Sequence, residues 1–300
     1  MSKTIRIGTR DSELALWQAH TVQKKLNDLG YKTEITAVKS QGDIILDKPL
    51  YELGITGIFT KTLDIAMING QVDIAVHSMK DVPTALPIGI VQAAVLERAN
   101  TLDILVHKGN LDFLNGEGTI ATGSLRRQAQ WLNKYPNHKV VDLRGNVNTR
   151  MQKLQDSNWS GAVFAAAGLE RINLKPSNYI NLDWIIPAPA QGAMVIVAMA
   201  NDDFCRDAVA ELNDIETEVC THIERQFLKT LEGGCTAPIG ALATIQEDEI
   251  VFSGVLFSLD GKEKIEVNKI VPLEEWKKLG FIAAKEILDN GGVSLMERIR

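Results

Sequence analysis

The sequence predicts an α/β protein in which two α/β domains are followed by a small α+β domain. Two stretches, residues 4–76 and 118–172, alternate between strand-like segments of period two and segments with helical spacing of apolar residues. A third stretch begins near residue 214, where strand-like segments follow one another between two helical ones. Alternating strands and helices are typical of α/β folds, whereas successive strands flanked by helices are typical of α+β folds.

The first stretch contains the pattern strand, helix, strand, helix, strand. Residues 4–9 alternate like a strand, and a helix with regularly spaced apolar residues follows and ends at Gly30. Residues 31–38 are the next predicted strand, 59–69 the next helix and 72–76 the last strand. This order is typical of βαβ units and predicts a largely parallel sheet.

The second stretch repeats the pattern and predicts a domain over residues 102–188. Each of its strands leads directly into a helical segment, and Pro187 and Pro189 mark a hinge at the end. The predicted pairs of strand and helix are 118–122 with 125–133, 139–143 with 147–155, and 162–166 with 168–172.

The C-terminal stretch begins with a predicted helix over residues 215–231. Strand-like segments follow at 241–245, 250–259 and 264–270, and a last helix is predicted over 273–288. We therefore expect a small antiparallel sheet with helices in this part.

The composition is that of a globular protein without a membrane span. Of its 300 residues 45% are hydrophobic and 23% charged, and its uncharged apolar runs are far shorter than the ~20 residues that cross a bilayer. The N-terminus lacks the apolar stretch of a signal peptide, so we expect a cytoplasmic protein. The net charge of −6 gives no general attraction to nucleic acid or acidic membranes, and we expect neither as a partner.

Polar side chains gather where the predicted strands end, which is where ligands bind in open α/β sheets. Arginine can grip a carboxylate or phosphate with two hydrogen bonds. The chain has no GxxxxGK[ST] loop, so a ligand with several carboxylates is favoured over a nucleotide. Alternatively, the arginines are solvated or paired with acids such as Glu170. The polar residues at these junctions are Arg10, Asp11, Ser12, Ser78, Lys80, Asp81, Ser124, Arg126, Arg127, Arg144, Asn146, Arg150 and Arg171.

The segment 76–83, VHSMKDVP, places a carboxylate among these cations. Asp81 either caps a turn before Pro83, a common position for aspartate, or acts as a general acid or base at the end of the strand. We interpret His77 as scaffold, because no second histidine or cysteine lies near it in the sequence.

The three cysteines show no CxxC spacing, which argues against a disulfide scaffold and against a zinc site, so no metal is expected. Cys205 and Cys220 lie in predicted helices, and we expect both to be buried as small apolar residues. Cys235 lies in LEGGCTAPIG (231–240), on a loop that can approach another domain closely. Its thiol is either without a role or a nucleophile.

Several segments resemble the hydroxymethylbilane synthase family, also called the porphobilinogen deaminase family. They occur in the family's order along essentially the whole chain, so the resemblance is specific. The segments are IGTRDSELALWQAH (7–20), VDIAVHSMKDVP (72–83), TGSLRRQAQ (122–130), LRGNVNTR (143–150), AAAGLERI (165–172), PAPAQGAM (187–194) and LEGGCTAPIG (231–240).

The resemblance implies two domains similar to periplasmic binding proteins and a third domain that carries the loop cysteine. Domain 1 would comprise residues 1–98 and 193–211, because the family's chain crosses back to it after the segment 187–191. Domain 2 would comprise residues 102–188 and domain 3 residues 215–300.

The resemblance also implies an enzyme of tetrapyrrole (haem) biosynthesis. Members join four molecules of porphobilinogen head to tail with loss of ammonia and release linear hydroxymethylbilane by hydrolysis. The product grows on a dipyrromethane cofactor, made from the substrate and bound through a thioether to the loop cysteine, here Cys235. We expect a monomer whose partner is this small-molecule substrate.

The matching positions acquire roles from the family. Asp81 matches the catalytic aspartate, which would hydrogen-bond pyrrole N–H groups, assist the departure of ammonia and stabilise a cationic azafulvene. Thr56 stands where many members carry a loop lysine. The cofactor-binding positions are matched by Ser78, Lys80, Ser124, Arg126, Arg127 and Arg150, besides Cys235. The substrate-binding positions are matched by Arg10, Ser12, Gln18, Arg144, Arg171 and Gln191.

A sensor that binds a polycarboxylate is the alternative, because two α/β domains and clustered arginines suit both functions. The glycine-flanked Cys235 and the third domain distinguish the two, since a solute-binding protein needs neither.

Overall fold

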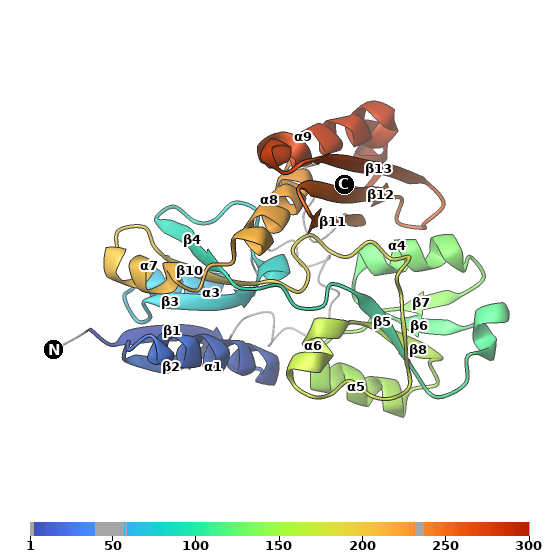
Figure 1. Cartoon of the computed structure of the whole chain (residues 1–300). Helices are drawn as coiled ribbons and strands as arrows, with labels where there is room; N and C mark the ends of the chain where they lie inside the picture. Colours follow the sequence, from blue (N-terminus) through green and yellow to red (C-terminus); the bar gives the residue numbers. More distant parts are fainter. Residues whose placement is uncertain (1–2, 40–56, 58, 232–236, 300) are drawn as a thin grey trace. The chain divides into compact units, whose positions relative to one another are not determined.

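The computed structural model describes residues 3–39, 57, 59–231 and 237–299 (Figure 1). These residues form two compact units. Unit 1 takes the described residues within 1–46, 55–99 and 192–218, and unit 2 takes those within 100–191 and 219–300.

Unit 1 is built on a five-stranded sheet with the order β2-β1-β3-β10-β4. Strand β1 pairs in parallel with β2 and β3, whereas β10 pairs antiparallel with both β3 and β4. The strands are β1 (Ile5–Arg10), β2 (Thr33–Val38), β3 (Ile74–Ser78), β4 (Ile90–Val95) and β10 (Met194–Met199).

Helices cover both faces of this sheet. On one face, Ile7 and Ile74 pack with Val22 of α1 (Glu13–Asp28) and with Cys205 of α7 (Asp203–Ala210). The helix α3 (Lys61–Ile68) lies on the other face. It packs against Gly8, the neighbour of Ile7 in β1, and neighbouring residues of a strand face opposite sides of the sheet. Its Leu63 lies so close to Gly8 that a Cβ added to the glycine would be 2.9 Å from the leucine side chain.

Ionic contacts fasten the beginning of β1 to the rest of unit 1. Arg6 donates from Nε and Nη2 to the Asp73 carboxylate at 2.9 and 2.8 Å. Lys3 Nζ lies 2.6 Å from Asp202 and 3.5 Å from both Asp73 and the Cys205 sulfur. Asp73, Asp202 and Cys205 have the geometry of a metal-ligating group, but the Lys3 ammonium already supplies the cation there.

Unit 2 contains a second five-stranded sheet, with the order β7-β6-β8-β5-β9. The pairs β6–β7 and β6–β8 are parallel, and β5 is antiparallel to β8 and β9. The elements of this part are β5 (Asp103–His107), η3 (Asp112–Asn115), β6 (Thr119–Ala121), α4 (Leu125–Lys134), β7 (Lys139–Val141), α5 (Val147–Asp156), β8 (Gly161–Ala165), α6 (Ala166–Arg171) and β9 (Tyr179–Asn181).

The two faces of this sheet have separate apolar clusters. Leu154 of α5 and Leu169 of α6 pack against Ile104 and Phe164 on one face. On the other face, the fully buried Trp131 of α4 packs with its neighbours on β5, β6 and β8.

The C-terminal part of unit 2 has a three-stranded antiparallel sheet in the order β11-β12-β13. Phe227 and Phe252 are fully buried at its centre, with ring centroids 5.3 Å apart in an edge-to-face arrangement. The elements are α8 (Ile215–Thr230), β11 (Ile239–Gln246), β12 (Glu249–Phe257), β13 (Lys264–Pro272), η4 (Leu273–Glu275), α9 (Trp276–Ile287), η5 (Leu288–Gly292) and α10 (Val293–Ile299).

The predicted fold class is confirmed, with two mixed α/β sheets and a small antiparallel sheet flanked by helices. The strands predicted in the two βαβ stretches do pair in parallel, β1 with β2 and β3, and β6 with β7 and β8. The complete sheets are mixed because β5 and β10 pair antiparallel with their neighbours. These two strands follow the non-helical segments 96–102 and 182–193, so the crossover rule for helix-linked strands does not apply to them. Because the parts with the second and third sheets belong to one unit, the division into three domains stays a prediction.

Both described cysteines are free and buried, as expected. Burial and a hydrogen bond with Asp202 raise the pKa of the Cys205 thiol to about 12, so this thiol is not a nucleophile at neutral pH. In the described part of the chain, no helix has the length and apolar character needed to span a membrane.

A buried carboxylate joins distant segments of unit 2. Glu224 of α8 is fully buried and accepts hydrogen bonds from the backbone N–H groups of Ala190 at 2.6 Å and Ala243 at 2.8 Å. It thereby ties α8 to β11 and to the segment that precedes β10.

We expect Glu224→Ala to lower the free energy of unfolding by about 2–4 kcal/mol, because two buried N–H groups lose a charged acceptor. Urea unfolding followed by circular dichroism measures this change. Glu216→Ala, at an exposed position of the same helix, is the control and should cost less than about 1 kcal/mol. Equal, small losses in both variants would contradict the role of Glu224.

His77 lies in β3 opposite Val195 of β10 and is 4% exposed. Its Nε2 is buried and has no hydrogen-bond partner among the described residues. Burial, together with the nearby charge of Arg10, lowers the pKa of His77 from 6.5 to about 4. The ring is therefore neutral at physiological pH, which suits the interpretation of His77 as scaffold.

This lowered pKa makes unit 1 sensitive to acid. Between pH 6.5 and 4 the unfolded chain binds a proton at this histidine that the folded chain does not. The free energy of unfolding therefore decreases as the pH is lowered through this range, by roughly 3 kcal/mol in total. We expect His77→Gln to lose this part of the acid sensitivity, measured by urea unfolding at pH 7 and 4.5. The exposed His20→Gln serves as the control. An unchanged pH dependence in His77→Gln would contradict the prediction.

Candidate active site

The predicted site residues of unit 1 lie at the carboxyl ends of β1 and β3. Arg10 is the last residue of β1, and its guanidinium carbon lies 4.5 Å from the centre of the Phe59 ring. Ser12 is the N-cap of α1 and accepts a hydrogen bond from the Ala15 N–H at 3.4 Å. The capping bond uses one oxygen lone pair and leaves the Ser12 hydroxyl hydrogen available to a ligand.

The structure brings Gln18 and Ser78 together, although they are 60 positions apart in the sequence. Gln18 is buried in α1 and donates from Nε2 to the Ser78 hydroxyl at 2.9 Å. This bond connects α1 to the end of β3, directly before the segment that carries Lys80 and Asp81.

Lys80 and Asp81 lie in a short 3₁₀ turn, η2 (Met79–Asp81). Met79 is buried, its N–H donates to the Ala193 carbonyl at 3.0 Å, and its carbonyl accepts from the Val82 N–H at 3.1 Å. With Met79 as the buried anchor, the side chains of Lys80 and Asp81 are only partly buried.

The structural alternative for Asp81, a cap of the turn before Pro83, is wrong. Val82 ends the turn, and its N–H bonds to the Met79 carbonyl rather than to the Asp81 carboxylate. No hydrogen bond or ion pair connects the Asp81 side chain to another described residue, Lys80 included. The carboxylate is thus held on a fixed turn and is available to a ligand.

In unit 2 the predicted residues begin at the start of α4. Ser124 is its N-cap and accepts from the Arg127 N–H at 3.4 Å. Arg126 and Arg127 lie in the first turn of this helix, both more than nine-tenths buried, and both pair with Asp103 at 2.7 Å. The positive end of the helix and two arginines therefore face a single carboxylate.

Arg144 and Arg150 occupy the next junction. Arg144 is buried, and this burial lowers the pKa of its guanidinium against the opposing effect of Asp142. Arg150 lies in the first turns of α5, and its Nε donates to the Gly145 carbonyl at 2.7 Å.

Arg171 ends α6, the helix that follows β8. Burial lowers its pKa to about 10, and the charge of Glu170 counteracts only part of this shift. Glu170 forms its ion pair with Lys175 at 2.8 Å and also accepts from Asn100 at 3.1 Å. Sequence analysis allowed that Glu170 neutralises an arginine. In the structure Glu170 pairs with Lys175, and its charge only partly offsets the effect of burial on the pKa of Arg171.

Gln191 lies in the segment before β10 and is fully buried. Its Nε2 group donates one hydrogen to the Thr101 carbonyl at 2.8 Å and one to Asp103 Oδ1 at 2.9 Å. Both amide hydrogens are thus used within the protein.

Sequence reasoning missed Asp103, the residue that Arg126, Arg127 and Gln191 share. It is the first residue of β5 and is fully buried. The sequence does contain a sign of this role, because Asp103 is a single acidic residue at the start of the apolar strand DILVH. A carboxylate buried with such a strand requires cationic partners.

Cys235 and Thr56 lie outside the described residues. Apart from the anionic Asp81, the described residues predicted to belong to the site are either uncharged polar residues or cations. Such a donor set suits a ligand with several carboxylates, and Arg126 Nε, buried without a hydrogen-bond partner, offers it an unused donor.

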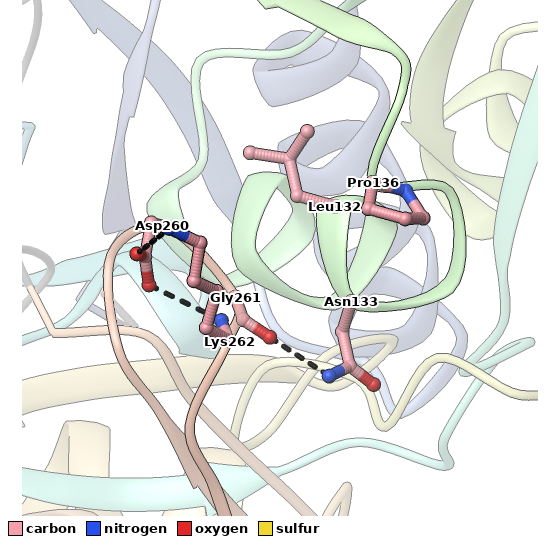
Figure 2. A pocket seen from close by; sticks show the side chains of 6 residues that line it. All are labelled: Leu132, Asn133, Pro136, Asp260, Gly261 and Lys262. Atoms are coloured by element: carbon pink, nitrogen blue, oxygen red, sulfur yellow. Dashed lines mark hydrogen bonds and ion pairs between the residues drawn. The ribbon is translucent and has the colours of Figure 1, made fainter.

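A surface pocket of unit 2 contains none of the predicted site residues. Figure 2 shows it between the end of α4 and the turn that joins β12 to β13, lined by Leu132, Asn133, Pro136, Asp260, Gly261 and Lys262. Asn133 Nδ2 donates to the Gly261 carbonyl at 2.8 Å. Gly261 has φ +74°, and a Cβ there would lie 2.3 Å from the Ala129 carbonyl oxygen, so this pocket is a packed junction that requires glycine.

Two family models match the chain. The model described as porphobilinogen deaminase, dipyrromethane cofactor binding domain, matches residues 5–207. The model described as porphobilinogen deaminase, C-terminal domain, matches residues 218–289. Together they cover both α/β sheets and most of the C-terminal part.

Among solved structures, similar chains include a double mutant of the VFT2 domain of BvgS from Bordetella pertussis, with 13% identity over 72% of this chain and 89% of that one, and a TM-score of 0.43. A probable amino-acid ABC transporter extracellular-binding protein from Bacillus subtilis has 13% identity over 71% and 90%, with a TM-score of 0.41. Likeness at this level is too remote to support a conclusion about this chain.

Curated relatives match from end to end. The porphobilinogen deaminase of Chlorobium phaeobacteroides is 38% identical over 100% of this chain and 99% of the relative. That of Desulfitobacterium hafniense is 40% identical over 99% and 98%. The chain therefore belongs to the porphobilinogen deaminase family.

Proposed function

We propose that this protein is a hydroxymethylbilane synthase that joins four molecules of porphobilinogen head to tail and releases the linear tetrapyrrole by hydrolysis. The main structural support for this proposal is the position of Asp81. Asp81 presents a carboxylate without a protein partner on a turn fixed by the buried Met79. Relatives named porphobilinogen deaminase match the whole chain and support the same assignment.

Each cycle breaks one C–N bond and forms one C–C bond. Porphobilinogen loses its aminomethyl nitrogen as ammonia, and the cation left on its methylene carbon is attacked by the free α-carbon of the preceding pyrrole, which then loses its proton. The Asp81 carboxylate stabilises the positive charge that develops as ammonia leaves, and it accepts hydrogen bonds from pyrrole N–H groups. A group without competing protein contacts can do this in every cycle, and water ends the series by hydrolysis.

The cationic residues bind the carboxylates of the substrate and of the growing product. Porphobilinogen carries an acetate and a propionate, so every added ring brings two further negative charges. Arg10, with its guanidinium over Phe59, and Arg144 and Arg171, whose burial lowers their pKa values, are suited to bind them. A buried cation gains more from an anionic ligand than an exposed one, because water screens it less.

The residues fit a dipyrromethane cofactor, which when bound supplies the first free pyrrole α-carbon. Its carboxylates would be held by Ser78 and Lys80 in unit 1 and by residues of unit 2 that include Ser124 and Arg150. We assign its thioether link to Cys235, and the burial of the Cys205 and Cys220 thiols supports this choice. We also propose that the protein is a monomer of the cytoplasm, where a thiol remains reduced and able to form a thioether.

Asp81→Asn tests the role of the carboxylate. The amide has almost the same shape and Asp81 makes no bond in the described structure, so we expect an unchanged melting temperature. Turnover of porphobilinogen should fall by at least about 100-fold, because loss of one electrostatic stabiliser of a transition state costs about 2.7–4 kcal/mol. Asp112→Asn, in the 3₁₀ turn η3, is the control and should retain turnover. Near-normal turnover in Asp81→Asn would refute the proposal for this residue.

Intact-protein mass spectrometry tests the cysteine. We expect the wild-type protein to carry a covalent increment of two pyrrole units and Cys235→Ser to lack it, together with its activity. Cys205→Ser and Cys220→Ser should keep the increment in their folded fractions. A wild-type protein that is fully active without any increment would overturn the assignment of Cys235.

A further inference from the structure

Thr9 is a polar residue in an apolar row of β1. Neighbouring residues of a strand face opposite sides of the sheet, so Thr9 lies on the same face as Ile5 and Ile7, the face that α1 covers. All three side chains are fully buried. A buried hydroxyl is costly unless it forms a hydrogen bond, so Thr9 requires a partner at this position.

The partner of Thr9 is the carbonyl of Ala15, in the first turn of α1. The Thr9 hydroxyl donates to this carbonyl at 2.9 Å, and both residues are buried. A carbonyl oxygen has two lone pairs, so Ala15 accepts this bond in addition to the one from within the helix.

This bond closes a short loop that carries two predicted substrate-binding residues. Residues 10–12 lie between Thr9 and the first residue of α1, and they include Arg10 and Ser12. Ala15 holds the Ser12 hydroxyl through its N–H at 3.4 Å, while Thr9 holds Ala15 through its carbonyl. A bond of 3.4 Å is long and weak, so the shorter bond from Thr9 contributes more to fixing the loop.

A second polar contact holds the same face of α1. Gln18 follows Ala15 by three positions, which places both on one face of the helix, and it donates to Ser78 at the end of β3 at 2.9 Å. Further along this face, the buried residues Val22 and Leu26 are apolar. Polar contacts therefore fix the end of α1 that lies at the candidate site, and apolar packing fixes the remainder.

We propose that Thr9 is a positioning residue for substrate binding, because its bond to the Ala15 carbonyl fixes the loop that presents Arg10 and Ser12. Thr9 is fully buried, so it acts through this loop and not by contact with the substrate. This inference rests on the proposed function, in which Arg10 binds carboxylates of porphobilinogen, and on the predicted substrate-binding role of Ser12.

The test separates the hydroxyl of Thr9 from its methyl group. Thr9→Val removes the hydroxyl and keeps the shape, and the Ala15 carbonyl keeps its helical bond, so no buried polar group loses its last partner. Thr9→Ser keeps the hydroxyl and removes a buried methyl group. Both variants are prepared as holoenzymes of the full chain. Their steady-state turnover of porphobilinogen and their melting temperatures are compared with those of the wild type.

We expect opposite effects in the two variants. Thr9→Val should raise KM about 3- to 10-fold with kcat within about 2-fold of the wild type, because one lost hydrogen bond weakens ground-state and transition-state binding alike. Its melting temperature should stay within about 2 °C, since a buried methyl group replaces the hydroxyl. Thr9→Ser should keep KM within about 2-fold and melt about 2–4 °C lower, because it leaves a small cavity.

Thr21→Val is the matched control. Thr21 lies on the same helix and donates the same kind of bond, from its hydroxyl to the Trp17 carbonyl at 2.9 Å, but this bond is exposed and lies outside the loop. This variant should change neither KM nor the melting temperature.

A wild-type KM in Thr9→Val would overturn the inference. An equal rise of KM in Thr9→Ser would also overturn it, because the effect would then follow damage to the fold and not the loss of the hydroxyl. A wild-type protein without turnover of porphobilinogen would instead refute the proposed function itself.

Discussion

The buried carboxylate of Asp103 is the interaction on which the arginine-bearing part of unit 2 depends. It joins the start of β5, the first turn of α4 and the segment before β10, three regions far apart in the sequence. Without this anion, two guanidinium groups would lie in the interior with no counter-charge, and the start of α4 would lose its tie to the sheet. Two arginines share this one carboxylate among the described residues, which suits a protein that receives carboxylates.

In unit 1 the candidate catalytic residue is held in place in a different way. Its carboxylate, Asp81, has no cationic partner in the described structure and lies on a 3₁₀ turn of three residues. Backbone bonds and the buried Met79 hold the turn, so the side chains beside it need no internal contacts to stay in place. Asp103 is fixed by its partners, whereas Asp81 is fixed by its backbone. A carboxylate that is held by its backbone, as Asp81 is, keeps its oxygen lone pairs available to accept hydrogen bonds from a ligand.

Local patterns predicted where the candidate site residues lie in the fold, at the ends of strands, but not which residues they contact. The turn with Lys80 and Asp81 and the junction with Arg126 and Arg127 followed from the ends of strands. The bond from Gln18 to Ser78 and the role of Asp103 did not, because they depend on tertiary contacts that no local pattern contains. The direction of β5 and β10 was missed for a similar reason, since a continuous apolar strand carries no information about its neighbours.

The order of strands in unit 1 bears on how the chain folds. Strand β10 (Met194–Met199) lies between β3 and β4, so the interior of the first sheet includes a strand that is made about a hundred residues after its neighbours. During synthesis, β3 and β4 would have a gap between their edges until that strand leaves the ribosome. The second sheet, formed from residues 103–181, would be complete earlier. The N-terminal sheet is therefore the later of the two to close, and its unpaired edges are the part of the nascent chain most exposed to aggregation.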